Sequence, residues 1–251
     1  MNTRDLLGRI YQGQTLVFGH RGAKGYAPMN TLPAFELALA QGAHGIELDV
    51  HRSRDGYPVI VHDFTVDHTT DGAGLVVEKT LAELKALDAG SWFSEEFRGV
   101  RIPTLDEVFE AVGRQLIINV EIKAEGEASD GVEQMVLDCI RRHAMQSRVI
   151  VSSFNPPTLK RFRALAPDIA IGFLHYPGMD TFEAVHDLDY EAFHPFFETI
   201  TADTIAEARS QRRIVNTWTV NDPQVAVHLR DLGVLGIITD YPDRILAALK
   251  A

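Results

Sequence analysis

Two imidazoles and two cationic side chains stand at the ends of apolar segments, where a reactive site can form. An apolar run at residues 16–18 leads to His20 and Arg21. A second run ends at His62, and a third leads to Lys123. Imidazoles titrate near neutral pH and suit general acid and base catalysis, whereas guanidinium and ammonium groups bind anions such as phosphate. The four side chains indicate chemistry on an anionic substrate if the fold brings them together.

Three acidic side chains follow the same pattern and predict a metal site. Glu47 and Asp49 lie two positions apart in a predicted strand and so share one face of it. Glu121 lies near the end of another such strand, just before Lys123. Three adjoining carboxylates need a cation, and oxygen ligands favour Mg²⁺ or Ca²⁺ over zinc. A divalent cation beside fixed positive charges and imidazoles suggests cleavage of a phosphate ester.

Each residue also has a purely structural interpretation. Glu47 and Asp49 could be neutralised by partners inside a barrel, and His20 could be a structural histidine at a strand end. Trp218 could be a core aromatic, or it could wall a small substrate pocket. The combination is more specific than its members, because separate strands place complementary groups at one rim.

The order of the predicted elements indicates a (β/α)8 TIM barrel, which is an α/β fold. Strands are predicted at residues 16–19, 45–50, 58–62, 116–122, 149–153, 169–174, 191–194, 214–220 and 236–239. Helices are predicted at residues 31–41, 105–112, 131–144, 158–166, 181–187, 204–210, 223–232 and 243–249. The second and third strands are too close for a parallel crossover and should form an antiparallel hairpin around Asp55-Gly56. Eight strand–helix units remain, which predicts one barrel domain over residues 1–251.

The hairpin and the segment after it bear on the site. Active sites of such barrels lie at the C-terminal ends of the strands. With the turn at Asp55-Gly56, His62 is predicted to lie opposite Asp49 and on the same face. A register slip of one residue would turn His62 away. Residues 63–101 are too long for a simple connection, and we expect an inserted subdomain that caps the catalytic end of the barrel.

Composition limits the class of protein and its partners. The formal net charge of −11 argues against a nucleic-acid partner. The single cysteine, Cys139, allows no disulfide within the chain and fits a reducing compartment. Residues 1–14 do not resemble a signal peptide, and no stretch approaches the about 18 apolar residues of a membrane span. We expect a cytoplasmic protein with a small-molecule partner and no stable membrane association; the oligomeric state is not predicted.

Motifs along almost the whole chain resemble those of one family. They are His20-Arg21-Gly22, Ala27-Pro28-x-Asn30-Thr31, Glu47-Leu48-Asp49-Val50, His62-Asp63, Glu121-Ile122-Lys123, Trp218-Thr219-Val220 and Thr239-Asp240-Tyr241-Pro242. The chain resembles the glycerophosphodiester phosphodiesterases of the bacterial cytoplasmic type. The resemblance implies a barrel of the phospholipase-C-like phosphodiesterase type. It also implies metal-dependent hydrolysis of glycerophosphodiesters to sn-glycerol 3-phosphate and an alcohol.

The resemblance assigns roles to the residues singled out above. Glu47, Asp49 and Glu121 would hold a divalent cation, Mg²⁺ or Ca²⁺. His20 and His62 would form the catalytic acid and base pair. Substrate would be bound by three residues, Arg21 and Lys123 at the phosphate and Trp218 at the pocket wall. Attack by the neighbouring glycerol hydroxyl, which gives a cyclic phosphate, and direct attack by water are not distinguished.

One departure from the family pattern leaves alternatives open. The family usually has glutamate where this chain has Met29, and that glutamate could orient Arg21 or support the metal site. A lysophospholipase D-like diesterase would need an apolar groove for acyl chains, which residues 63–101 and the aromatic residues at 193–197 could line. A phosphate-ester binding barrel without catalysis is the third reading, although the intact His20 and His62 argue against it.

Overall fold

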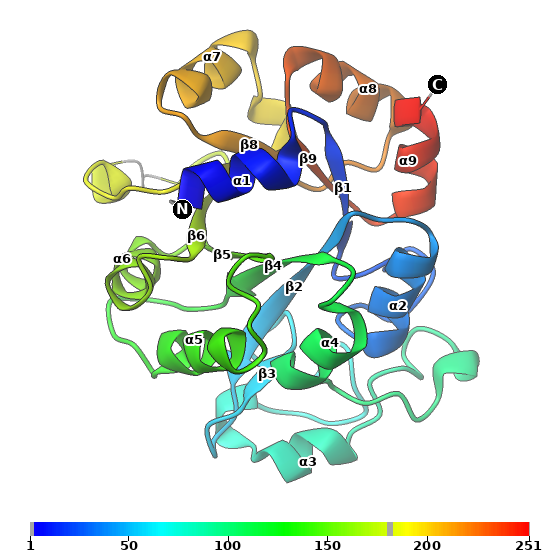
Figure 1. Ribbon diagram of the computed structural model, residues 1–251. Helices are drawn as coiled ribbons and strands as arrows, with labels where there is room; N and C mark the ends of the chain where they lie inside the picture. The colour runs from blue at the N-terminus through cyan, green and yellow to red at the C-terminus, as the bar shows by residue number, and fades with distance from the viewer. Residues whose placement is uncertain (1–2, 180–182, 251) are drawn as a thin grey trace.

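Eight strands pair side by side in parallel and close into a barrel (Figure 1). The computed structural model describes residues 3–179 and 183–250. Pairing of β1 with β2 completes the ring and confirms the predicted TIM barrel. The barrel strands are β1 (Leu16–His20), β2 (Gly45–Arg52), β4 (Ile117–Ile122), β5 (Val149–Ser153), β6 (Ala170–His175), β7 (Ala192–Pro195), β8 (Ile214–Thr217) and β9 (Gly236–Thr239).

Helices surround this barrel, mostly where the sequence predicts them. They are α2 (Leu32–Ala40), α4 (Leu105–Val112), α5 (Val132–Arg142), α6 (Pro156–Leu165), α7 (Ala202–Ser210), α8 (Pro223–Leu232) and α9 (Pro242–Lys250). The short turn η4 (Phe197–Thr199) precedes α7. The predicted helix at 181–187 begins outside the described residues, and its described part contains only the 3-10 turn η3 (Glu183–Val185). None of the helices in the described ranges is long and apolar enough to cross a membrane.

The N-terminal helix α1 (Thr3–Tyr11) is absent from our sequence-based prediction. It lies across the barrel in Figure 1, at the N-terminal ends of the strands. Thr3 Oγ1 donates a 2.5 Å hydrogen bond to Glu191, which directly precedes β7. Leu7 and Tyr11, one helical turn apart, are buried against the apolar side chains inside the barrel. The helix therefore closes the end of the barrel opposite to the end at which the strands finish.

The hairpin of β2 and β3 (Pro58–Ile60) corrects the predicted register. The antiparallel pairs are Val50 with Ile60 and His51 with Val59, and the Val61 amide donates to the Asp49 carbonyl at 3.1 Å. Val61 and not His62 is therefore opposite Asp49. The prediction was wrong by one residue because the pairing of Arg52 with Pro58 centres the connection on Asp55 and not between Asp55 and Gly56. β3 also ends at Ile60. His62 lies beyond the strand, so strand alternation does not fix the direction of its side chain.

Residues 63–101 form a segment with its own small apolar cluster. It contains η1 (Val76–Glu78), α3 (Leu81–Ala86) and η2 (Glu95–Phe97), and it lies at the foot of the molecule in Figure 1. Val66, Val76 and Leu84 pack with residues from β3 and from the approach to α4. A capping box at Thr80 begins α3. That this segment caps the catalytic end stays a prediction.

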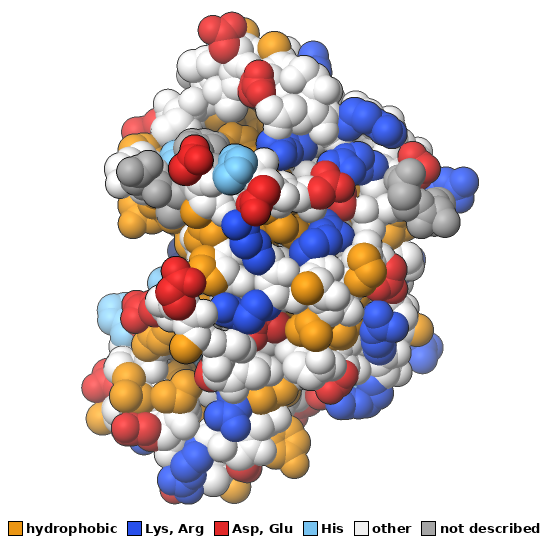
Figure 2. Space-filling view, turned by 90° about the vertical axis from the view of Figure 1, so that its left-hand side faces the viewer, with side chains coloured by type: hydrophobic (Ala, Val, Ile, Leu, Met, Phe, Trp, Pro, Cys, Tyr) orange, Lys and Arg blue, Asp and Glu red, His pale blue; other side chains and the backbone are white. Residues whose placement is uncertain are grey.

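The outer surface over α5 and α6 carries charges of both signs. Figure 2 shows Lys and Arg side chains standing among Asp and Glu side chains on this face. Several of them form ion pairs between helices and the segments beside them. These include Lys160–Asp187, Arg161–Glu133 and Arg163–Glu191. This face therefore carries mixed charge.

Candidate active site

The turn after β1 presents His20 and Arg21 to the acidic residues of β2. Arg21 and Gly22 have φ angles of 54° and 84°, in the left-handed region that most side chains avoid. A Cβ atom on Gly22 would lie 2.6 Å from the carbonyl carbon of Ala34, so only glycine fits. The Arg21 amide then donates a 3.1 Å hydrogen bond to Glu47 Oε2. His20 ends β1 and Arg21 begins this turn, so both side chains lie where opposite charges can compensate their burial.

The three predicted metal ligands come together. Strands β2 and β4 pair Asp49 with Glu121, and Glu47 lies on the same face two residues earlier. Oxygen atoms of the three buried carboxylates all lie within 4.8 Å of one another. Asn30 Nδ2 donates to Asp49 Oδ2 at 2.9 Å, and Asn30 Oδ1 accepts from the Asp49 amide at 3.4 Å. Because β1 and β3 pair with other parts of β2, Asn30 fills the gap between them.

A divalent cation fits this cluster. Burial, reinforced by the charges of Asp49 and Glu121, raises the pKa of Glu47 well above its ordinary value. Burial also raises the pKa of Glu121 to about 7, although Lys123 opposes the shift. Asp49 Oδ1 is buried and accepts no hydrogen bond from any described residue. Crowded carboxylates that ionise fully only beside added positive charge are the donors that Mg²⁺ and Ca²⁺ prefer.

Arg21 and Lys123 stand beside Asp49 and keep it ionised. Arg21 Nε lies 3.1 Å from Asp49 Oδ2, while Lys123 Nζ lies 3.4 Å from Asp49 Oδ1 and 2.7 Å from Glu121 Oε1. Burial alone would raise the pKa of Asp49, but the two cations bring it below its ordinary value. Arg21 Nη1 also contacts Met29 Sδ at 3.3 Å. Met29, which stands where the family usually has glutamate, therefore contacts Arg21 and can affect the orientation of its guanidinium.

Both histidines hold one ring nitrogen against a carboxylate. His20 Nδ1 donates to Asp240 Oδ1 at 2.8 Å, and its Nε2 lies 4.0 Å from Glu47 Oε2. His62 Nδ1 donates to Asp63 Oδ1 at 2.5 Å. Burial lowers the pKa of His20 to about 4 and also lowers the pKa of His62. Because a carboxylate only accepts, each Nδ1 carries the hydrogen and each Nε2 is left to exchange a proton.

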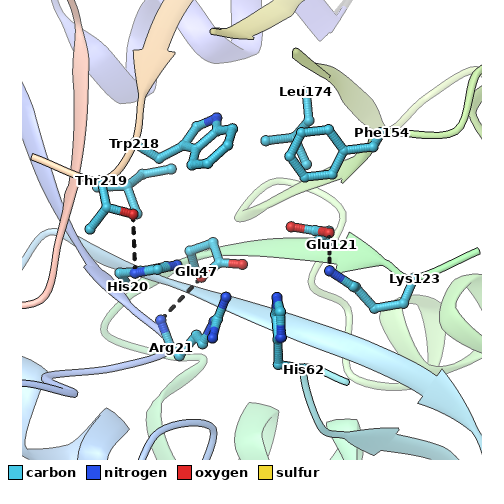
Figure 3. Close-up of a pocket in the computed structure, with 11 residues that line it drawn as sticks. His20, Arg21, Glu47, His62, Glu121, Lys123, Phe154, Leu174, Trp218 and Thr219 are labelled. Carbon is cyan, nitrogen blue, oxygen red and sulfur yellow. Dashed lines mark hydrogen bonds and ion pairs between the residues drawn. The ribbon is translucent and has the colours of Figure 1, made fainter. Parts of the chain in front are cut away.

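One pocket of about 110 Å³ collects nearly all the predicted site residues (Figure 3). Asp49 does not line it and is buried against Arg21 and Lys123. Figure 3 shows Trp218, Leu174 and Phe154 facing the charged groups across the space. The pocket thus has a charged wall and an apolar wall. The predicted residues that line it are His20, Arg21, Glu47, His62, Glu121, Lys123 and Trp218.

Sequence reasoning assigned no role to several residues that the structure places at this site. Asp240 directly follows β9, so the rule that TIM-barrel sites lie at strand ends places it at the rim, but the sequence does not show that it pairs with His20. Asn30 belongs to a quoted motif, yet its contact with Asp49 depends on how the turn folds. Phe154 and Leu174 look like ordinary core residues in the sequence, so nothing there marks them as pocket walls.

Comparison with known proteins places this geometry in context. Residues 20–244 match the model of the glycerophosphoryl diester phosphodiesterase family. A glycerophosphodiester phosphodiesterase of Caldanaerobacter subterraneus subsp. tengcongensis is 39% identical, over 94% of this chain and 98% of that protein. A Bacillus altitudinis glycerophosphodiester phosphodiesterase is 36% identical over 92% of this chain and 96% of that protein. The structure of an Oleispira antarctica phosphodiesterase in complex with the product sn-glycerol-3-phosphate matches with a TM-score of 0.87 and 34% identity, over 96% of this chain and 99% of that one.

Proposed function

The chain belongs to the glycerophosphoryl diester phosphodiesterase family and is a glycerophosphodiester phosphodiesterase, and we propose how its residues carry out the hydrolysis. A divalent cation, Mg²⁺ or Ca²⁺, is held by Glu47, Asp49 and Glu121. His20 and His62 exchange protons with the reacting oxygens. The products are sn-glycerol 3-phosphate and an alcohol. One observation carries the proposal: both histidines line the same pocket as two positively charged side chains and two of the acidic ones. These are Arg21, Lys123, Glu47 and Glu121.

The charged wall binds the phosphodiester. Lys123 Nζ and the Arg21 guanidinium lie at this wall, and both are strong ligands for phosphate oxygens. Their ion pairs with Asp49 hold them in position before substrate arrives. When bound, the cation would stabilise negative charge that develops on the phosphate oxygens. Trp218 and Phe154 form the opposite wall, where the carbon skeleton of a glycerol ester can pack. The relative that holds sn-glycerol-3-phosphate supports this choice of substrate.

The two histidines account for the proton transfers. Nε2 of one imidazole takes the proton of the attacking oxygen as that oxygen bonds to phosphorus. The other imidazole takes up a proton from solvent at Nε2 when the anionic substrate binds beside it, and it gives that proton to the alcohol oxygen as the bond between this oxygen and phosphorus breaks. Asp240 and Asp63 hold the rings so that Nε2 is the atom that exchanges the proton. The attacking oxygen comes from water or from the neighbouring glycerol hydroxyl; a cyclic phosphate among the products identifies the second route.

The pocket offers little to the lysophospholipase alternative. Its apolar lining consists of Phe154, Leu174, Trp218 and Ile238. Neither the aromatic residues at 193–197 nor residues 63–101 are among the described residues that line it. A volume of about 110 Å³ suits a glycerol group better than a long acyl chain. We therefore propose a small glycerophosphodiester, such as one with choline or ethanolamine, as the substrate.

A coupled assay for glycerol 3-phosphate tests the proposal, and release of choline is measured in parallel because cleavage of lysophosphatidylcholine would give choline but no glycerol 3-phosphate. Glycerophosphocholine, glycerophosphoethanolamine and lysophosphatidylcholine are compared, with a chelator and then with Mg²⁺ or Ca²⁺ added back. We expect turnover of the first two, loss of activity with the chelator and recovery with metal. His20→Ala should lower kcat by roughly 10²- to 10⁴-fold. His228→Ala, on the exposed surface of α8, is the matched control and should retain activity.

Three results would contradict the proposal. Full activity in chelator would exclude the metal role of Glu47, Asp49 and Glu121. Unchanged turnover by His20→Ala would remove the catalytic role of that imidazole. No turnover of any of these diesters by the wild-type protein, together with tight binding of glycerol 3-phosphate, would favour a barrel that binds phosphate esters without hydrolysing them.

A further inference from the structure

A second group of metal-binding side chains lies outside the barrel, between α4 and α5. Asp106 is in the first turn of α4, and Cys139 and His143 lie one turn apart at the C-terminal end of α5. One possible ligand atom from each residue lies within 4.8 Å of the others. Cys139 is fully buried, whereas the side chains of Asp106 and His143 are 27% and 19% exposed. The group is therefore closed on the protein side and open to solvent on one side.

The three side chains converge on one carboxylate. His143 Nε2 donates to Asp106 Oδ1 at 2.8 Å, and Cys139 Sγ lies within 4.8 Å of an Asp106 carboxylate oxygen. Arg142 forms an ion pair with the same oxygen. The ring of Phe109 packs edge-on against the His143 ring at 5.7 Å and limits its movement. One sulfur, one nitrogen and one oxygen atom, contributed by two helices, thus lie within 4.8 Å of one another.

From this arrangement we propose that Asp106, Cys139 and His143 bind a transition-metal ion, with Zn²⁺ as the preferred one. Thiolate and imidazole select Zn²⁺ and Co²⁺ over Mg²⁺ and Ca²⁺, which take oxygen ligands. The thiolate and the carboxylate together balance the charge of a divalent ion, so the buried side of the site stays neutral. Three protein ligands leave the fourth tetrahedral position to water on the open side.

Metal binding requires that Cys139 lose a proton, that His143 change its tautomer, and that the ion pair between Arg142 and Asp106 break. Burial and the neighbouring Asp106 raise the pKa of the Cys139 thiol, so it is protonated in the metal-free protein. As the Sγ–metal bond forms, the thiol proton leaves to solvent. The His143 proton moves from Nε2 to Nδ1, which frees the Nε2 lone pair for the metal. Arg142 leaves Asp106 and turns toward water, which its position allows because its side chain is 60% exposed.

The ion has a route to the site and a structural consequence. A surface hollow of about 520 Å³ borders Arg142 and His143 and gives solvent access. A bound ion would join the N-terminal end of α4 to the C-terminal end of α5, so it should raise the unfolding temperature by mass action. None of the three residues lines the catalytic pocket, so the proposal of this metal site and the proposal of the hydrolytic site can be tested independently.

The single cysteine makes an optical test specific. Metal-free, reduced protein is titrated with Co²⁺ alone, and the thiolate-to-cobalt charge-transfer band in the near ultraviolet is recorded. Because Cys139 is the only cysteine in the chain, and the acidic cluster of the barrel offers only oxygen, the band reports this site alone. We expect the band to saturate at the intensity of one thiolate-bound Co²⁺ per chain, whatever further Co²⁺ the acidic cluster of the barrel takes up, and to disappear when Zn²⁺ is added.

Variants separate ligation from general effects of substitution. Cys139→Ser should abolish the band, and His143→Gln should weaken Co²⁺ binding at least tenfold while keeping a partner for Asp106. His143 is partly exposed, so its variant should fold even if the buried serine does not. His186 is an exposed histidine that does not belong to this cluster, so His186→Gln should leave the titration unchanged. Absence of the band in folded wild-type protein, or unchanged affinity in His143→Gln, would overturn the proposal.

Discussion

The two imidazoles of the pocket are oriented in the same way but by different means. His20 uses Asp240, which also accepts a 2.9 Å hydrogen bond from Asn221 and lies 3.3 Å from Lys24 Nζ. His62 uses Asp63, its immediate neighbour in the chain. The partner of His20 is therefore fixed from several sides, so the tautomer of that ring depends on residues far away in the sequence.

Replacing Asp240 should show that it acts through His20. In Asp240→Asn the amide can donate to Nδ1, which favours the tautomer with hydrogen on Nε2, so Nε2 no longer accepts a proton. We expect kcat to fall by roughly 10²- to 10⁴-fold with little change in KM. Steady-state kinetics with glycerophosphocholine measure both values, and the ¹⁵N shifts of the His20 ring report the tautomer.

The matched control is Asp243→Asn, at an exposed carboxylate of α9 that hydrogen bonds to Tyr26 and not to a histidine. Its kcat should equal that of the wild-type enzyme. If Asp240→Asn raised KM and left kcat unchanged, Asp240 would act on substrate binding and not on the imidazole.

At the scale of elements, hydrophobic patterns were sufficient to predict helices and strands wherever the tertiary contacts agree with the local preference of the sequence. The barrel strands, the hairpin and most helices follow from periodicity and turn residues. The register of His62 did not follow, because the hairpin connection is centred on Asp55 and not between Asp55 and Gly56. Convergence of Glu47, Asp49 and Glu121 was predictable from strand ends, whereas the contact of Asn30 with Asp49 depends on a turn whose path the sequence does not specify.

The N-terminal helix shows a second limit. Its apolar spacing at Leu7 and Tyr11 fits a helix, but the segment is short and has only about two turns. Its stability comes from the barrel, against which those side chains are buried. The Tyr11 hydroxyl donates a 3.0 Å hydrogen bond to Asn216 Oδ1, and Asn216 Nδ2 donates to His194 at 3.1 Å. A helix that forms through such contacts is hard to identify from local sequence.

Removing one hydroxyl should measure this anchoring. Tyr11→Phe leaves Asn216 Oδ1 buried without its donor, which should lower the free energy of unfolding by about 1–3 kcal/mol. Urea denaturation measures the change. Because α1 lies at the end of the barrel away from the pocket, kcat should not change. The control is Tyr57→Phe, at a residue that is 46% exposed, with an expected effect within about 0.5 kcal/mol. Equal stabilities of the two variants would show that the hydroxyl contributes nothing.

For the whole molecule, a buried neutral histidine links stability to pH. Burial lowers the pKa of His194 from 6.5 to about 3. Below pH 6.5 the unfolded chain binds a proton at this residue that the folded chain does not. The contribution of His194 to the free energy of unfolding should therefore be constant above pH 6.5. It should fall as the pH drops from 6.5 toward 3, by up to about 1.4 kcal/mol per pH unit.

Urea denaturation at several pH values tests this slope. In His194→Gln the glutamine side chain can still accept a hydrogen bond from Asn216. The free energy of unfolding of this variant should fall less steeply with acid than that of the wild-type protein, with a slope that is smaller by up to one bound proton. His20, whose pKa burial also lowers, titrates in both proteins and cancels in the comparison. His228→Gln, at an exposed residue, should keep the wild-type slope. Identical slopes in His194→Gln and wild type would mean that His194 becomes protonated in the folded state.

The hydrogen bond between His20 and Asp240 joins the first barrel strand to the residue that follows the last one. During synthesis on the ribosome, the imidazole emerges long before its carboxylate. In the proposed mechanism, the nascent chain thus lacks the carboxylate that orients His20 until nearly all of it has been translated. We therefore expect a chain cut short before its final strand to be inert even where the rest has folded.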